Sequence, residues 1–263
     1  MRRIYFVAAL GILLVPMLAS AQSAFNGTWK VDMSKVDFPT KPDVYVLKGG
    51  MYECKTCVPS YNIKADGTDQ KISGHPYYDT MAVKVINDRE IEETDKKNGK
   101  VVATSKTMVS ADGKKLMFEF SDRSNTNGAP VTGKGEEVRV APGPAGSSPL
   151  SGSWRTTKIE NMSDNAITWN YKVSGDELTM TNPTGQSYTA KLDGTEAPMK
   201  GDPGVTTVSI KKMGKNIIEE TDKREGKVIS VTKMTVGPDG KTANLVSEDK
   251  LHGTTMKFTA MKQ

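Results

Sequence analysis

The sequence predicts an all-β protein of two tandem antiparallel domains, and three features support this fold class. The chain is an internal duplication, because the segment IEETDK occurs at residues 91–96 and again at 218–223, a shift of 127 residues. Turn dipeptides such as Asp-Gly and Asn-Gly recur at hairpin spacing in both copies. Between these turns lie short segments rich in Val, Ile, Thr, Tyr and Phe, which favour strands.

The two copies open on similar motifs. FNGTWK occupies residues 25–30, and LSGSWR occupies residues 150–155. A segment rich in Pro and Gly, residues 142–149, separates the copies and is typical of a linker. We therefore predict a first β domain over residues 22–141 and a second over residues 150–263, each large enough to bury its own core and to fold independently. The alternative is that the two copies form one continuous β structure.

The first 21 residues predict a signal peptide. Arg2 and Arg3 give a charged start, residues 4–18 form an apolar run, and residues 19–21 are small, as at a cleavage site before Gln22. A membrane anchor is the alternative, but the run is shorter than the roughly 20 residues that a spanning helix needs. We therefore expect no transmembrane segment after cleavage, and a secreted or periplasmic protein.

The charge pattern argues against a nucleic-acid partner. The full chain has 36 basic and 31 acidic residues, for a net charge of +5. The two signs are interspersed, without the basic block or stripe that binds a phosphate backbone. We therefore expect no nucleic acid among the partners.

The strand segments mix Thr, Ser, Lys and Glu with aliphatic residues on both faces. A sheet with one dry face and one wet face alternates more cleanly than this. The pattern fits either a barrel with a partly polar interior or strands that lie at a rim.

The duplicated hairpin suggests its own register. A two-residue loop would place Lys97 opposite Lys100, and like charges directly across from each other are destabilising. A four-residue loop over residues 96–99 instead places Asp95 opposite Lys100. We predict the four-residue loop.

The apolar-x-Gly-x-Trp-cation start of each copy, followed by a run of hairpins, resembles the first strand of the lipocalin and fatty-acid-binding superfamily. The chain is similar to bacterial secreted lipocalin-like (calycin-type) β-barrel proteins in tandem duplication. This resemblance implies two up-and-down antiparallel β-barrels, in which Trp29 and Trp154 have structural roles at a closed end. It also implies a basic residue on each tryptophan: Arg139 suits that place in the first copy, whereas lysine is the only cation at the end of the second.

The only two cysteines, Cys54 and Cys57, are spaced Cys-x-x-Cys. In an exported protein such a pair is oxidised, and a turn at the two intervening residues brings the cysteines close enough for a disulfide. A redox catalyst would need the first cysteine at a helix N-terminus, which the surrounding strand pattern does not supply. The spacing of a four-ligand zinc site is absent, so we expect a structural disulfide, no metal and no cofactor.

Comparing the copies separates shared scaffold from special features. His75, Tyr77 and Tyr78 occur only in the first copy, and Trp169 and Tyr171 only in the second. We expect a ligand site where the copies differ, so these five residues are the ligand-site candidates.

The sequence offers no convincing catalytic set. His75 and Asp79 with a hydroxyl group would make a hydrolase triad on paper, but a loop histidine beside proline is typical of an exposed turn. The duplicated acids are adjacent pairs, and neighbours on a strand point to opposite faces. We expect these acids to lie on solvated faces; they are Glu92, Glu93, Glu219 and Glu220.

These observations predict an exported, non-enzymatic binding protein for a small apolar or amphipathic ligand held in a barrel mouth. The alternative is a cell-envelope or glycan-adhering module, which the tyrosines and the Pro-Gly segment suggest. A hydrolase or a redox enzyme is supported only by the weak constellations described above.

Overall fold

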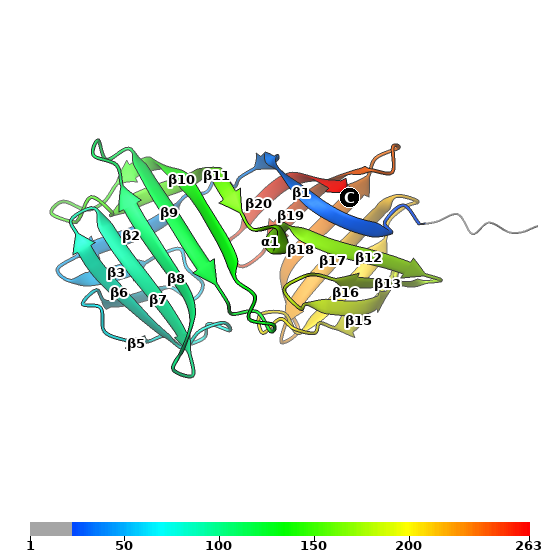
Figure 1. Ribbon diagram of the computed structural model, residues 1–263, viewed down its shortest axis with the longest axis horizontal. Coiled ribbons are helices and arrows are strands. Elements are labelled where there is room, and N and C mark those ends of the chain that lie inside the picture. The colour runs from blue at the N-terminus through cyan, green and yellow to red at the C-terminus, as the bar shows by residue number, and fades with distance from the viewer. Residues whose placement is uncertain (1–22) are drawn as a thin grey trace, which may run out of the picture.

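The computed structural model describes residues 23–263, so the predicted signal peptide lies outside the described residues. The chain forms two antiparallel sheets of ten strands each, and each sheet curls into a nearly closed barrel (Figure 1). This confirms the all-β fold class with two barrel-like units. Among the described residues, no helix is long and apolar enough to cross a membrane.

The first barrel lies on the left in Figure 1. In spatial order its strands are β4 (Tyr61–Lys64), β3 (Met51–Cys54), β2 (Asp43–Lys48), β11 (Gly152–Met162), β10 (Val131–Pro142), β9 (Lys115–Asp122), β8 (Lys100–Val109), β7 (Glu90–Lys97), β6 (Thr80–Asn87) and β5 (Gln70–Lys71).

The second barrel lies on the right in Figure 1. In spatial order its strands are β14 (Ser187–Lys191), β13 (Glu177–Thr181), β12 (Thr168–Ser174), β1 (Gly27–Asp37), β20 (Thr254–Lys262), β19 (Thr242–Asp249), β18 (Lys227–Val236), β17 (Ile217–Arg224), β16 (Thr207–Lys212) and β15 (Asp193–Pro198). One helical turn, α1 (Asp164–Ile167), precedes β12.

The two tryptophan-bearing strands are exchanged between the barrels. Strand β1 pairs with β12 and β20 of the second barrel, where it appears in blue in Figure 1. Strand β11 pairs with β2 and β10 of the first barrel. Sheet membership therefore differs from the predicted division into residues 22–141 and 150–263, because each copy's opening strand completes the sheet of the other copy.

The exchange has a local cause in the Pro/Gly-rich segment 142–149. This segment connects β10 to β11 as the turn of a hairpin inside the first barrel, so it is not the boundary that we predicted. The chain crosses between the barrels at residues 38–42 and 163–167 instead. Because β1 and β11 carry the same Gly-x-Trp pattern, either strand fits the tryptophan-bearing position of either sheet.

The duplicated hairpin has a two-residue loop, so the predicted four-residue loop is wrong. Lys97 pairs with Lys100, and a bulge lies between Asp95 and Lys96. Asn98 and Gly99 have φ of 51° and 77°, the left-handed conformation whose twist matches that of the flanking strands. Lys100 is exposed, so water screens the like charges, and the turn geometry decides the register.

Fragments test the strand exchange directly. We expect residues 38–163 to unfold cooperatively as an isolated fragment, because they contain all ten strands of the first barrel. Residues 164–263 lack β1, so this fragment should fold only when a peptide of residues 23–38 is added. Urea titration followed by circular dichroism measures both outcomes.

The matched control is the fragment of residues 22–141, which lacks β11. It should show no cooperative transition. A cooperative transition of this fragment, with no gain in the second fragment on addition of the peptide, would contradict the exchange.

Candidate ligand-binding site

Each barrel contains a fully buried tryptophan. The indole N–H of Trp29 donates a hydrogen bond of 2.8 Å to the carbonyl of Phe25, and that of Trp154 donates one of 2.9 Å to the carbonyl of Leu150. Both rings therefore satisfy their only polar atom inside the core. This agrees with the structural role expected of the two tryptophans.

A cation covers each tryptophan, and the strand exchange decides which one. The Arg139 guanidinium lies 4.0 Å from the centre of the Trp154 ring, and the Lys262 ammonium lies 4.8 Å from that of Trp29. Arg139 also donates hydrogen bonds to the carbonyls of three residues, Gly113, Pro149 and Ser151. Each cation thus comes from the copy opposite to its tryptophan, and each of the three nitrogens of the Arg139 guanidinium is held by a carbonyl.

The glycine of this motif is required by the close approach of Arg139. Gly152 has φ of 149°, and a Cβ atom there would lie 2.6 Å from Nη1 of Arg139. A side chain would therefore push the guanidinium off Trp154.

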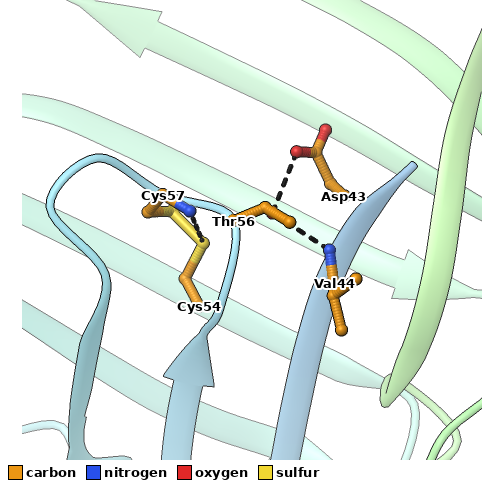
Figure 2. The surroundings of a disulfide bond; sticks show 5 residues. All are labelled: Asp43, Val44, Cys54, Thr56 and Cys57. Atoms are coloured by element: carbon orange, nitrogen blue, oxygen red, sulfur yellow. Dashed lines mark hydrogen bonds between the residues drawn. A yellow bond between two sulfur atoms is a disulfide. The ribbon is translucent and has the colours of Figure 1, made fainter. Parts of the chain in front are cut away.

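Cys54 and Cys57 form the predicted disulfide. Figure 2 shows it beside β2, where the Thr56 hydroxyl donates a hydrogen bond of 3.1 Å to Asp43 and accepts one of 3.0 Å from the N–H of Val44. Cys54 is buried at the end of strand β3, not at the start of a helix. The disulfide therefore closes the turn that follows β3, and the hydrogen bonds of Thr56 fasten this turn to β2.

The interior of the first barrel contains a cavity of about 310 Å³, near the lower end of the roughly 300 to 1,000 Å³ typical of ligand pockets. Its lining combines aromatic, aliphatic and acidic side chains, and no lysine, arginine or histidine of the described residues belongs to it. The lining residues are Tyr45, Tyr52, Cys57, Tyr61, Ile91, Glu93, Ser105, Thr107, Leu116, Phe118, Glu119, Phe120, Glu137 and Leu150. The cavity is thus apolar over most of its wall and has acids as its only charged groups.

Glu137 is the most unusual residue of the cavity. Its side chain is 6% exposed, and one carboxyl oxygen accepts a long hydrogen bond of 3.3 Å from the Thr156 hydroxyl. The other oxygen, Oε2, is buried without a partner among the described residues. Burial, with a smaller contribution from nearby Asp43, raises the pKa of Glu137 to about 7.

Glu93 is the second acid of the cavity. Its Oε2 accepts a hydrogen bond of 2.8 Å from the Ser105 hydroxyl, whereas its Oε1 is buried without a partner in the described part of the chain. Burial raises the pKa of Glu93. Asp95 lies next on the same face of β7, and burial together with the charges of Glu93 and Asp122 raises its pKa to about 7.

These positions correct our expectation for the duplicated acids. Glu92 is exposed as predicted, but Glu93 and its repeat equivalent Glu220 point into the barrels. The signal was present in the sequence, because Glu93 is two residues from Ile91 and side chains two apart share a face. Ile91 is 1% exposed, so the face that holds it and Glu93 is the inner one. The interior is therefore partly polar, as one of our two alternatives stated.

In the second barrel two tyrosines hold one oxygen of the equivalent carboxyl. Tyr171 and Tyr188 donate hydrogen bonds of 3.1 Å and 2.5 Å to the same oxygen of Glu220. Burial and the neighbouring charge of Asp222 raise the pKa of Glu220 to about 7. Trp169 packs edge-on against Tyr171, with ring centres 6.1 Å apart. These two candidates from the second copy therefore belong to a packed core.

The two barrels differ in sequence at positions that line the cavity of the first barrel. By strand register, Glu137 on β10 is equivalent to Ala260 on β20. Likewise Thr107 on β8 is equivalent to Met234 on β18. Ala260 and Met234 are buried in the core of the second barrel. The second barrel thus fills with apolar side chains the positions at which the first barrel has a polar group and open space.

The candidates from the first copy lie at a separate, smaller hollow of about 130 Å³. His75 stacks on Tyr78 with ring centres 3.8 Å apart, and both line this hollow beside Asp95. Burial, with help from the positive charges of Arg224 and Lys97, lowers the pKa of His75 to about 4.

Tyr77 lies beside this hollow, but its hydroxyl is already engaged. It donates a hydrogen bond of 2.9 Å to Asp202 of the second copy and so joins the two barrels. Tyr77 is therefore part of the contact between the barrels.

The hydrolase triad of His75, Asp79 and a hydroxyl group that we considered from the sequence does not form. Asp79 accepts hydrogen bonds from the N–H of Asn98 and from the Thr80 hydroxyl, and Nδ1 of His75 has no partner within residues 23–263. In the same part of the chain, no group of three or more His, Cys, Asp or Glu side chains is placed to hold a metal ion.

No protein-family model matches this chain. No curated protein sequence matches it either.

Removing the disulfide should cost little stability. The bond joins residues only three apart, so the loop it closes is short, and Cys54→Ser with Cys57→Ser should lower the free energy of unfolding by about 1 to 2 kcal/mol. Urea unfolding of the oxidised protein and of the double variant measures this difference. Thiol titration of the native protein should find no free thiol, and two reactive thiols would contradict a structural disulfide.

Buried Glu137 predicts that stability falls as pH rises. Below about pH 4 the carboxyl is protonated in the folded and the unfolded chain, whereas between about pH 4 and 7 only the folded chain keeps the proton. The stability that it contributes is therefore present at low pH and lost by about pH 7. Because the folded pKa is about 7, Glu137→Gln should reduce the loss between pH 5 and pH 8 by about 2 to 3 kcal/mol in urea unfolding.

The control for this measurement is Glu92→Gln, which removes an exposed carboxyl from a strand of the same barrel. It should lose as much stability between pH 5 and pH 8 as the unsubstituted protein. Equal losses in both variants would show that Glu137 is ionised in the folded state at both pH values.

Proposed function

We propose that this protein binds a small, largely apolar ligand inside its first barrel and performs no chemistry on it. The observation that carries the proposal is the 310 Å³ cavity, whose wall is mostly aromatic and aliphatic with a few polar groups. Ligand sites have this composition, because apolar surface supplies affinity and a few polar groups fix orientation.

The second barrel supports this proposal as an internal reference. Both barrels come from one duplication and share the buried tryptophan and the inward Glu93 or Glu220. A stable barrel of this type is therefore possible with Met234 and Ala260 in its core. The first barrel lacks these two apolar side chains and leaves space open in its core, which reduces its stability. Such a loss is expected at a functional site.

The polar groups of the cavity suit binding better than catalysis. A hydrolase needs a nucleophile next to a base. Neither histidine lines the cavity. The hydroxyl of Ser105 donates to the carboxyl group of Glu93, but the other oxygen of that carboxyl has no partner within residues 23–263, so no third group orients it as a base.

The inward direction of the tyrosines favours an enclosed ligand over a glycan on the surface. Tyr52, Tyr171 and Tyr188 are buried at 6%, 8% and 2% exposure, so they do not form an exposed aromatic platform. We interpret the predicted signal peptide and the Gly-x-Trp motif as features of an exported, lipocalin-like carrier. A disulfide suits an oxidising compartment outside the cytoplasm.

Saturable binding of an uncharged fluorescent probe tests the proposal. We expect N-phenyl-1-naphthylamine or retinol to bind the chain without its predicted signal peptide at one site. Thr107→Met, which copies the packing of the second barrel, should weaken this binding at least tenfold, because the methionine fills the cavity. Fluorescence titration measures the affinity.

The matched control is Thr104→Met on the exposed face of the same strand, which should bind both probes as the unsubstituted protein does. No saturable binding of either probe, or equal binding by the two methionine variants, would count against a ligand in the first barrel.

A further inference from the structure

We propose that the ligand of the first barrel is a small organic cation, an amine with an aromatic or aliphatic body, whose ammonium group pairs with Glu137 and Glu93. This inference rests on the proposed function and specifies the class of ligand. It is carried by the position of the two carboxyl groups in the cavity wall, by the absence of cations from that wall, and by the surrounding tyrosine rings.

The first step is the unsatisfied carboxyl oxygen of Glu137. The side chain is more than nine-tenths buried, lines the cavity and leaves Oε2 without a donor among the described residues. A buried polar group without a hydrogen-bond partner reduces stability, and more so if it is charged. The fold does not need a carboxyl here, because alanine occupies the equivalent position in the second barrel. A ligand that donates hydrogen bonds would supply the missing partner.

The second step is the sign of the charge around Glu137. Asp43 on β2 contributes to the raised pKa of Glu137, and Glu93 on β7 lines the same cavity, whereas Glu119 on β9 is exposed on the outer face. The nearest cation along β10 is Arg139, which is held by three carbonyl groups and by the Trp154 ring. Within residues 23–263, no Lys, Arg or His side chain lines the cavity to neutralise these acids. Such a cavity repels an anionic ligand and attracts a cationic one.

The third step is the aromatic wall. The rings of Tyr45 and Tyr52 are stacked with centres 6.3 Å apart, and Tyr61 lies 6.3 Å from Tyr52 at an angle of 50°. The faces of tyrosine rings attract ammonium groups, most strongly where water is excluded. Phe118 and Phe120 line the same cavity and offer an apolar surface for the body of the amine.

The buried carboxyls also imply that binding is linked to proton release. In the empty cavity, burial raises the pKa of Glu137 to about 7, so the group is largely protonated below neutral pH. An ammonium group favours the ionised form and would displace the proton. Affinity for an amine should therefore rise at least tenfold between pH 5.5 and pH 8.

Three indoles with one ring system and different head groups test the inference. Tryptamine carries an ammonium group, tryptophol a hydroxyl and indole-3-acetate a carboxylate. Calorimetric titration of the chain without its predicted signal peptide should give one tryptamine site, with tryptophol at least tenfold weaker and indole-3-acetate undetectable. Glu137→Gln keeps the shape and removes the charge, so it should weaken tryptamine at least tenfold and leave tryptophol within about twofold.

The control variant is Glu92→Gln, whose exposed carboxyl lies on the other face of β7 and which should bind all three indoles as the unsubstituted protein does. Circular dichroism of each variant verifies folding, and Glu137→Ala, which copies the second barrel, provides a second test of the same position. Tryptophol binding as tightly as tryptamine, or a tryptamine preference that survives both Glu137 variants, would overturn the inference and leave the proposed function standing. Failure of all three indoles together with retinol and N-phenyl-1-naphthylamine would overturn both.

Discussion

The pairing of each tryptophan strand with the last strand of the opposite copy is the constraint on which the architecture depends. Trp29 and Trp154 are fully buried, and each lies under a cation from the last strand of the opposite copy. Because β1 precedes the first barrel in sequence but completes the second, the second barrel needs segments from both ends of the chain, whereas the first is complete within residues 43–162. The exchange therefore makes the second core, and not the first, depend on a strand from the other copy's end of the sequence.

The sequence was sufficient to predict the all-β class, the duplication, the disulfide and the burial of the two tryptophans. These features depend on local patterns, such as turn dipeptides and the Cys-x-x-Cys spacing. The strand exchange was not predictable in this way, since β1 and β11 carry the same motif and each fits either sheet. Only long-range pairing distinguishes the two arrangements, and a single sequence does not encode that pairing as a local signal.

The candidate site was predicted less well, for a related reason. The predicted positions that differ between the copies include His75 and Tyr78, which line a minor hollow. Glu137, which lines the cavity, was not predicted. The equivalence of Glu137 and Ala260 depends on strand register near the ends of the two copies, where the shift between them is no longer 127 residues. Glu93 was missed because it is shared by both copies, and shared features were assigned to the scaffold.

Shared and special features combine in the first barrel, and this explains how one scaffold supports two different interiors. In the second barrel, the inward glutamate is held by two tyrosine hydroxyl groups, which makes it part of the core. In the first barrel, Glu93 has a serine donor and one oxygen without a donor in the described chain, and Glu137 adds a second acid across open space. Removing packing and adding an acid both reduce the stability of that barrel, whereas the duplicated partner keeps the well-packed version of the same fold. Since residues 43–162 supply all ten strands of the first barrel, this loss of stability falls on a unit whose sheet is complete in itself.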